Sequence, residues 1–588
     1  MTRGTWIGHP GLRGSPDVIR LSASQLDQTD GRCREFAALK ARPQVWPEVS
    51  ERRRYAPWEA FPLGLVMAAL DAVEFRDADL DEAVTHAVEE SRSPLHPGAA
   101  AWVRHACHAY AEASAWIDDS LAGEGVVLLP EAQPRVVQHR SAAELRMLTA
   151  WGRWYAAQDG SVREFRRLRL RRPGPAGAPG THAMALVTAT GLRAVGSVYR
   201  DLPVEVRPDA AAPVRVRVVE VALDLDVLPK VLVDATPEEV RRSYHDHARP
   251  IALDVTVGGD RTPGSDCAEC KLRATCDTLP NTPGLLGLAD RGTHRRTWSV
   301  STGRQYQICP AQAHLRELRL PSERGEDHTS VRRGVLVHEW LRIAHGRERP
   351  CTPADLPEDG PGFAGEFMTH GEYREIRPFL LAHLEVCPLT ASCTDVRPEP
   401  TVAAFDPLAD VLVIAKPDLL RRVDRRVVYR EQKTTLSPDR FEPGDALSRV
   451  PQLALAVCLI AAGVFGPGGG TVELEVMSPQ RAFVLSFDMA DPAIVAQARE
   501  VVTGLVRDWH RDTGFLARPG RWCTGCPVAR WCPDRADGDT SGPIEVDGVR
   551  IDPRTGEVLS AQAAVSIRAE AVAESISDPG TADEEPPF

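Results

Sequence analysis

The 588-residue sequence has no apolar run long enough to span a bilayer, and its N-terminal stretch MTRGTWIGHPGLRGSP lacks the hydrophobic segment of a secretion signal. It also lacks a G-x-x-x-x-G-K-[ST] loop, so any ATP-driven step would have to come from a partner. We therefore expect a cytoplasmic protein with no membrane contact and no P-loop ATPase site of its own.

Aromatic residues are scarce, at 6%, but 43% hydrophobic and 26% charged residues are ordinary for a globular protein of several domains. The 13 cysteines are an odd number and cluster with the spacing of metal ligands. This pattern favours metal sites in a reducing compartment over a framework of disulfides. The formal net charge of −12 is unfavourable for binding nucleic acid unless positive charge is concentrated locally.

One local concentration is RRLRLRR at 166–172. In a strand, alternating arginine and leucine would present one cationic face, so Arg169 and Arg171 are predicted to contact DNA phosphates. The other basic runs, at 291–296 and 421–426, are as expected for a solvated surface.

A hairpin is predicted where strand 411–421 is followed by strand 427–435. A two-residue turn centred on Asp424-Arg425 would place Asp418 opposite Glu431, although Asp-Arg is not a favoured pair for such a turn. Two opposed carboxylates repel one another unless they hold a cation, and magnesium prefers oxygen ligands.

Side chains alternate along a strand, so Glu431 and Lys433 share one face and Gln432 has the other. Lys433 could then orient an attacking water and offset negative charge on a phosphate. The alternative is an ordinary ion pair on a solvated surface.

The residues Pro417-Asp418 and Glu431-Gln432-Lys433 resemble the motif of the PD-(D/E)XK nuclease superfamily. A helical histidine in RGVLVHEWLRIAHG and a helical glutamine in PQLALAVCLIAAG resemble the RecB-like branch. The resemblance implies that Mg²⁺ or Mn²⁺ is bound by His338, Asp418 and Glu431. It also implies that Lys433 assists water attack and that Gln452 positions the lysine or the DNA. Glu399 is a further acidic candidate, and the alternative for His338 is an ordinary structural histidine.

The sequence RWCTGCPVARWCP has the spacing C-x2-C-x5-C, and a single cysteine lies far upstream. Four thiolates of this kind hold an iron–sulfur cluster or a zinc ion. The arrangement is similar to that of RecB-like iron–sulfur nucleases, which include the AddB exonuclease subunit and the CRISPR spacer-acquisition nucleases. That resemblance implies a 4Fe-4S cluster, with zinc as the alternative, on Cys309, Cys523, Cys526 and Cys532.

The same spacing recurs in SDCAECKLRATCD, with an upstream partner. A second cluster, of iron–sulfur or zinc, is therefore predicted on Cys33, Cys267, Cys270 and Cys276. The repeated spacing indicates two copies of one domain.

The first copy lacks the metal-binding set in every alignment. Matching Gly64 with Gly334 puts Ala68 where His338 stands. The counterpart of the hairpin has its turn at Asp159-Gly160. One alignment sets Glu164-Phe165-Arg166 against the Glu-x-Lys motif, with Trp151 in the aspartate position, and another puts Tyr155 there.

The predicted fold class is α/β, with two tandem restriction-endonuclease-like domains, each a mixed sheet flanked by helices and closed by cysteines. We expect a degenerate domain over 1–280, with strands near 161–170, 213–223 and 250–257. A linker over 281–296 and an active nuclease domain over 297–536 follow. The acidic tail, 537–588, is expected to be mostly disordered apart from a short hairpin near 547–559.

The predicted function is that of a metal-dependent DNA nuclease, specifically an exonuclease, in DNA repair, recombination or antiphage defence. The DNA is single- or double-stranded, and a helicase is the expected partner. One alternative is a non-catalytic DNA-end or junction clamp working beside a helicase. Another is a zinc-stabilised scaffold with no role in nucleic-acid metabolism, which the acidic charge would suit.

Overall fold

The computed structural model forms two compact units, one of residues 1–279 and 318–321, the other of residues 280–317 and 322–588. The residues that the structure describes are 6–27, 31–48, 62–91, 95–170, 177–198, 204–209, 211–224, 227–292, 295–323, 329–536, 544–546, 549–551 and 558–561. The fold is α/β, as predicted, with mixed sheets flanked by helices in both units.

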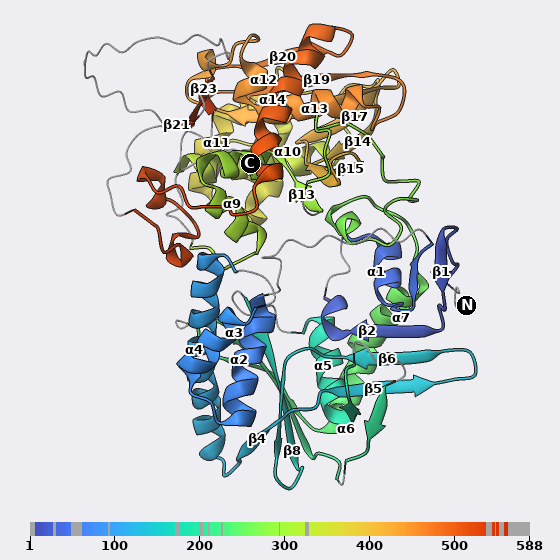
Figure 1. The fold of residues 1–588 in the computed structure, drawn as a ribbon. Helices are drawn as coiled ribbons and strands as arrows, with labels where there is room; N and C mark the ends of the chain where they lie inside the picture. Colours follow the sequence, from blue (N-terminus) through green and yellow to red (C-terminus); the bar gives the residue numbers. More distant parts are fainter. Residues whose placement is uncertain are drawn as a thin grey trace. The chain divides into compact units, whose positions relative to one another are not determined.

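The first unit contains three long helices that lie side by side (Figure 1): α2 (Pro62–Arg76), α3 (Leu80–Glu89) and α4 (Pro97–Ala122). Helix α4 also contacts a five-stranded sheet. The order of that sheet is β12-β11-β8-β7-β4, formed by Lys230–Ala235, Arg215–Ala222, Val162–Arg169, Arg153–Ala157 and Leu128–Glu131.

A second sheet of this unit has the order β10-β9-β5-β6-β2, formed by Glu205–Arg207, Leu192–Val195, Arg135–Arg140, Leu145–Thr149 and Val18–Ser22. A small pair joins β1 (Leu12–Gly14) to β3 (Val45–Pro47). Helices α5 (Pro179–Thr190) and α6 (Pro237–Ser243) contact these sheets, and α1 (Arg34–Lys40) packs against α7 (Arg249–Val257).

The strand predicted near 250–257 is wrong, because those residues form α7. Its β-branched residues favour a strand, but Pro250 lies in the first turn, where proline suits a helix. Ala252 and Val255 are buried in the main core of the unit. Tertiary packing therefore overrides local propensity here.

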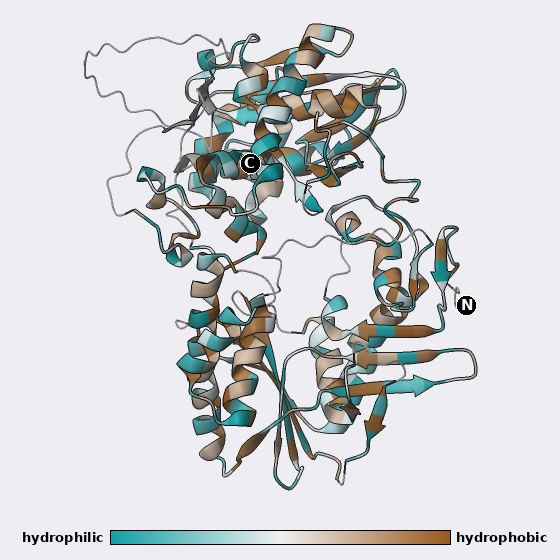
Figure 2. Ribbon diagram, viewed as in Figure 1, coloured by the Kyte–Doolittle hydropathy of each residue, from teal (hydrophilic) through white to brown (hydrophobic). Residues whose placement is uncertain are grey.

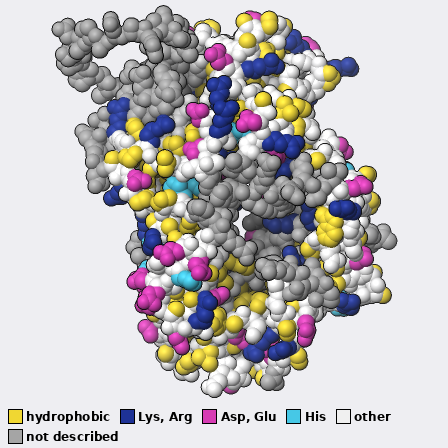
Figure 3. All heavy atoms as spheres, in the orientation of Figure 1, with side chains coloured by type: hydrophobic (Ala, Val, Ile, Leu, Met, Phe, Trp, Pro, Cys, Tyr) yellow, Lys and Arg dark blue, Asp and Glu magenta, His cyan; other side chains and the backbone are white. Residues whose placement is uncertain are grey.

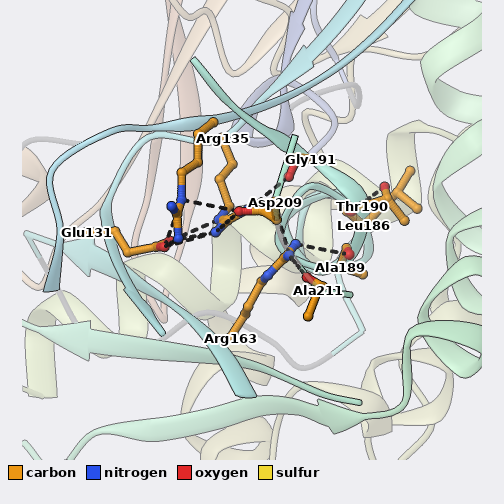
Figure 4. Close-up of polar contacts among 10 residues, drawn as sticks. Glu131, Arg135, Arg163, Leu186, Ala189, Thr190, Gly191, Asp209 and Ala211 are labelled. Atoms are coloured by element: carbon orange, nitrogen blue, oxygen red, sulfur yellow. Dashed lines mark hydrogen bonds and ion pairs between the residues drawn. The ribbon is translucent and has the colours of Figure 1, made fainter. Parts of the chain in front are cut away.

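Buried charges of the first unit are paired internally. Arg135, 1% exposed, lies between Glu131 and Asp209, and Arg163 also points toward Asp209 (Figure 4). These contacts join β4, β5 and β8 to the loop that carries Asp209.

Figure 3 shows acidic side chains gathered over α3 and α4, so the face in view there does not suit DNA phosphates.

The second unit is built on a five-stranded sheet of order β14-β17-β18-β19-β20, formed by Cys393–Pro398, Leu419–Val423, Arg426–Thr434, Gly470–Met477 and Ala482–Asp488. A three-stranded sheet has the order β13-β16-β15, formed by Arg296–Trp298, Val411–Ala415 and Val402–Asp406.

Helices α10 (Thr329–His345) and α11 (His370–His383) pack together and contact the large sheet. The apolar helix α13 (Pro451–Ala461) also contacts β18 and β19 and packs against α14 (Pro492–Arg511) (Figures 1 and 2). Three shorter helices are α8 (Val300–Ile308), α9 (Pro310–Glu317) and α12 (Ala446–Arg449).

The predicted linker is packed into the second unit. Backbone N–H groups of Gly284 and Leu286 donate to the two carboxylate oxygens of the buried Asp406, each at 3.0 Å. Leu285, Leu286 and Leu288 are buried. The segment therefore serves as part of this unit's core.

The hairpin predicted near 547–559 is confirmed by β22 (Val549–Ile551) and β23 (Val558–Ala561), which pair antiparallel. A third strand, β21 (Ile544–Val546), pairs antiparallel with β22. The rest of the predicted disordered tail beyond 536 lies outside the described residues. Among the described residues, no helix has the length and apolarity needed to cross a membrane.

Candidate active site

The hairpin of β17 and β18 has the predicted register, which runs from Val423 opposite Arg426 to Leu419 opposite Arg430. Asp424 and Arg425 form the turn, with φ of 50° and 67°. Two positive φ values are typical of a type I′ turn, which matches the twist of an antiparallel pair. The turn therefore has a favoured geometry in spite of unfavoured residues.

Asp418 lies in a break between β16 and β17, at Lys416-Pro417-Asp418. The sequence predicts one continuous strand over 411–421, but proline cannot donate to a ladder. The carboxylate of Asp418 accepts a 2.6 Å hydrogen bond from the backbone N–H of Gln432. Its other oxygen lies 3.1 Å from Nδ1 of His338, on α10.

Glu431 and Lys433 follow on one face of β18, with Lys433 Nζ 4.0 Å from a carboxylate oxygen of Glu431. Glu431 is 3% exposed. Its Oε1 is buried and has no hydrogen-bond partner among the described residues. A buried, unsatisfied carboxylate oxygen is costly, so this atom is a position where a ligand would relieve an energetic penalty.

His338, Asp418 and Glu431 line a cleft of about 620 Å³ in the second unit. Gln452, at the start of α13, lines it too, so four of the five predicted catalytic or metal-binding residues converge here. Lys433, the fifth, is not part of the lining and lies beside Glu431 on β18. Glu399 lies on the wall, where it accepts a 2.6 Å hydrogen bond from Lys416.

Sequence reasoning did not identify Tyr429 as part of the cleft. Its position two residues before Glu431 on the same strand was the available signal, because side chains two apart share a face. Burial raises the pKa of the Tyr429 hydroxyl, and the neighbouring Glu431 raises it further. The group therefore stays neutral and adds no charge to the site.

The two carboxyl groups have opposite pKa shifts. Burial raises the pKa of Glu431 to about 8, and the charge of Asp418 adds to this shift. For Asp418, burial acts in the same direction, but His338 and Lys433 outweigh it and hold its pKa below the ordinary value. In the metal-free protein, Asp418 is thus the ionised member of the pair.

The donor set fits a hard divalent cation by chemistry, with an imidazole and two carboxylates, one of which has a buried oxygen without a hydrogen-bond partner among the described residues. Among the described side chains, however, only one group of three or more metal-ligand atoms lies within 4.8 Å of one another, and these three residues are not in it. Magnesium keeps several waters and is usually held by one or two carboxylates, so it does not require three converging protein ligands.

The four cysteines predicted in the second unit line one small cavity: Cys309, Cys523, Cys526 and Cys532. Cys309 directly follows α8 as its C-cap, and its sulfur accepts a hydrogen bond from Arg518 N at 3.4 Å. The thiol set is therefore assembled from segments about 200 positions apart.

The four cysteines of the first unit likewise line one cavity: Cys33, Cys267, Cys270 and Cys276. The two loops have the same local geometry. Gly264 N donates to Cys267 Sγ at 3.5 Å, and Gly520 N donates to Cys523 Sγ at 3.4 Å. The group of converging metal-ligand atoms found among the described residues includes neither cysteine set.

The large sheets of the two units have the same topology. From β4 to β12 and from β14 to β20, the successive pairs are antiparallel, antiparallel, parallel and antiparallel. Strands β7 and β8 thus correspond to β17 and β18. Matching the two hairpins at their turns puts Arg153 in the place of Asp418 and Arg166 in the place of Glu431.

This register differs from both alignments expected from the sequence, because neither Trp151 nor Tyr155 takes the aspartate position and Glu164 does not take that of Glu431. Both arginines are buried, at 3% and 0% exposure.

The first unit fills its corresponding site with ion pairs. Arg153 donates to Asp71 on α2 at 2.9 Å and also pairs with Glu74. By contact, Asp71 is thus the α2 counterpart of His338, one helical turn beyond the Ala68 expected from the sequence. Arg166 donates to Glu164 at 2.6 Å and to Asp118 at 2.7 Å.

The arginines expected to contact DNA are differently placed. Arg169, with a third of its side chain exposed, pairs with the buried Glu220 at 3.0 Å. Arg167 on the same face is buried and pairs with Asp27 at 2.9 Å. The positive charge of this face is thus partly neutralised by Asp27 and Glu220 of the same unit. Arg171 lies outside the described residues.

Comparison with known proteins identifies one family. Residues 297–533 match the model described as the PD-(D/E)XK nuclease superfamily. A solved structure titled "Crystal structure of SSO0001" is similar at 12% identity and a TM-score of 0.18, covering 40% of this chain and 97% of the other. No curated protein matches the chain.

Proposed function

Because residues 297–533 form a domain of the PD-(D/E)XK nuclease superfamily, we propose that this chain is a metal-dependent DNA nuclease. The proposed catalytic residues are Asp418, Glu431, Lys433 and Gln452, with His338, Asp418 and Glu431 as ligands of Mg²⁺ or Mn²⁺. We extend the proposal to a RecB-like exonuclease of DNA repair, recombination or antiphage defence that acts beside a separate helicase.

One observation carries the proposal: an acidic pair lines a 620 Å³ cleft, a lysine neighbours Glu431 on the same strand, and one carboxylate oxygen of Glu431 is buried with no hydrogen-bond partner among the described residues. A protein that only binds DNA gains nothing from a buried unsatisfied carboxylate, which costs stability. A catalytic metal site accounts for that cost, since activity often demands a destabilising arrangement.

The residues have distinct roles in hydrolysis. A divalent ion bound at the carboxylates would polarise the scissile phosphate and lower the pKa of the attacking water. The Gln432 N–H holds Asp418 in place, and His338 fixes its other oxygen. Lys433 orients the water and offsets the negative charge that develops on phosphate. Gln452 borders the cleft, where it positions the substrate strand.

For the cysteines, we propose a 4Fe-4S cluster in each unit. The supporting observation is that each set of four borders a single cavity and that both loops have the same C-x2-C-x5-C spacing. Four thiolates of this kind hold an iron–sulfur cluster, and zinc is the alternative that the metal content would distinguish.

The first unit is proposed to be an inactive copy that holds DNA. Its sheet topology and cysteine loop correspond to those of the second unit, and arginines occupy its acidic positions. Arg169 and Arg171 stay candidates for phosphate contact, although Glu220 offsets the charge of Arg169.

The test is cleavage of end-labelled single- and double-stranded DNA by the full chain, with Mg²⁺, with Mn²⁺ and with a chelator. We expect Asp418→Asn and Lys433→Ala to lower the turnover rate by at least about 10²-fold while DNA binding persists, since phosphate contacts are spread over the surface.

Lys416→Ala is the matched control, because Lys416 lines the same cleft but pairs with Glu399. It should weaken binding more than turnover at saturating DNA. Wild-type cleavage by the Lys433→Ala protein would show that the site assignment is wrong and would favour a non-catalytic clamp.

A further inference from the structure

A second group of metal-ligand side chains lies in the second unit, apart from the cleft. It comprises His345, Cys351, His383 and Cys387, whose ligand atoms all lie within 4.8 Å of one another. Both histidines and Cys351 are buried, at 1%, 0% and 8% exposure. Among the described residues, no other such group occurs.

The four residues come from the ends of two helices and the segments that follow them. His345 is the last residue of α10, and Cys351 lies six residues later. His383 is the last residue of α11, and Cys387 lies four residues later. The two thiols are adjacent, since the backbone N–H of Cys351 donates to the sulfur of Cys387 at 3.4 Å.

The geometry matches a tetrahedral zinc site. With Zn–N bonds of about 2.0–2.1 Å, two nitrogen ligands of a tetrahedron lie about 3.3 Å apart. The Nε2 atoms of His345 and His383 are 3.3 Å apart. Two nitrogens and two sulfurs also make up a common donor set of structural zinc.

The orientation of His383 is set from the opposite side of its ring. Its Nδ1 lies 2.5 Å from a carboxylate oxygen of the fully buried Glu475, on β19. If Nδ1 donates to that carboxylate, the lone pair of Nε2 points into the group of four. A carboxylate behind a histidine in this way is the usual support of a zinc ligand.

Glu475 is itself held in place. Its second oxygen accepts hydrogen bonds from Gln432 at 2.9 Å and from Arg430 at 3.0 Å, both on β18. Glu475 thus links His383 to β18, the strand that carries Glu431 and Lys433. The link uses Arg430 and Gln432, whose side chains lie on the opposite face of that strand.

A hydrogen bond between two imidazoles could account for the histidine pair alone. It would leave unexplained why two cysteine sulfurs, from segments 36 positions apart, converge on the same point. A disulfide between Cys351 and Cys387 would explain the sulfurs but not the histidines. One tetrahedral ion explains all four.

We propose that His345, Cys351, His383 and Cys387 bind one structural Zn²⁺. Four protein ligands close the coordination shell, so the ion has no open position for a substrate. Its role is to join the C-terminal ends of α10 and α11 and to hold both against β19. Because His338 lies two helical turns before His345, the ion also fixes the helix that carries the histidine of the cleft.

The test is the metal content of the full chain, purified without chelators, by mass spectrometry. We expect one zinc per chain at this site, and its loss in the double variant Cys351→Ser/Cys387→Ser. Cys393→Ser is the matched control, because Cys393 is a nearby cysteine outside the group, hydrogen-bonded to Pro388 O at 3.3 Å. It should keep the zinc.

Glu475→Gln keeps all four ligands and tests the geometry if the double variant does not fold. Loss of the supporting carboxylate should weaken zinc binding by about 10–100-fold in competition with a chelator. Zinc that stays in the double variant would belong to the cysteine loops. That result, a zinc-free wild-type protein, or a Cys351–Cys387 disulfide would each overturn the proposal. None of these results depends on nuclease activity.

Discussion

The two units carry opposite charges at corresponding positions of two sheets that have the same topology. The second unit has Asp418 and Glu431 where the first has the buried Arg153 and Arg166. In the first unit each arginine is matched by acidic partners of the chain, whereas Glu431 has an oxygen without a partner among the described residues. The comparison shows that one sheet topology can hold buried charges that are neutralised within the chain or a buried carboxylate that needs a ligand for its neutralisation.

The largest effect on stability is expected from Arg166→Met in the first unit. The change would break the fully buried pair with Glu164 and a pair with the half-exposed Asp118, and loss of one partner of a buried pair costs about 3–5 kcal/mol. Urea denaturation measures the loss. Arg242→Met, at an exposed pair with Glu238, is the control and should cost less than about 1 kcal/mol. Equal losses would mean that ion pairs do not stabilise the first site.

A smaller and opposite effect is expected from Glu431→Gln. In wild-type protein from which a chelator has removed metal ions, burial raises the pKa of Glu431 from 4.5 to about 8. Its contribution to stability is therefore full below pH 4.5 and lost as the pH rises to about 8, because only the unfolded chain releases the proton early.

Thermal denaturation of both proteins between pH 4.5 and 8 measures this difference. The variant should lose less stability over that range than the wild type. Added Mn²⁺ should stabilise the wild type more than the variant, since an ion that binds only the folded state raises its stability. Parallel pH profiles would contradict the buried, unsatisfied state of Glu431.

The smallest effect is expected from Arg169→Ala. Glu220 already offsets its charge, so we expect DNA affinity to fall by less than about tenfold and the salt dependence to change little. Binding titrations at several salt concentrations would measure both. A large loss of affinity would show that DNA displaces Glu220 from Arg169, and the first unit would then be the main DNA-binding surface.

The sequence predicted the register that puts Asp418 opposite Glu431 because its signals are local. Alternation along β18 and the position of one turn determine which side chains of the hairpin face each other. The two cysteine sets could be predicted for the same reason, since three members of each lie within ten residues. By contrast, the strand predicted near 250–257 was wrong because packing of α7 into the core of the first unit overrode the strand propensity of its β-branched residues.

The Cys/His group was not predicted, because its ligands follow no short motif and meet only when α10 and α11 pack. The counterparts of Asp418 and Glu431 in the first unit were misaligned for a related reason. Sequence similarity offers no guide when carboxylates are replaced by arginines, whereas strand register does.

The alternation of β18 also limits how its gene can change. Glu431 faces the cleft and Gln432 faces Glu475, so adjacent codons specify two separate environments. Deleting or inserting one codon upstream in the strand would turn the acid toward Glu475 and the amide toward the cleft, disrupting both environments at once. In proteins that descend from this chain, insertions and deletions should therefore be confined to the turns outside β18. The strand itself should change by substitution alone.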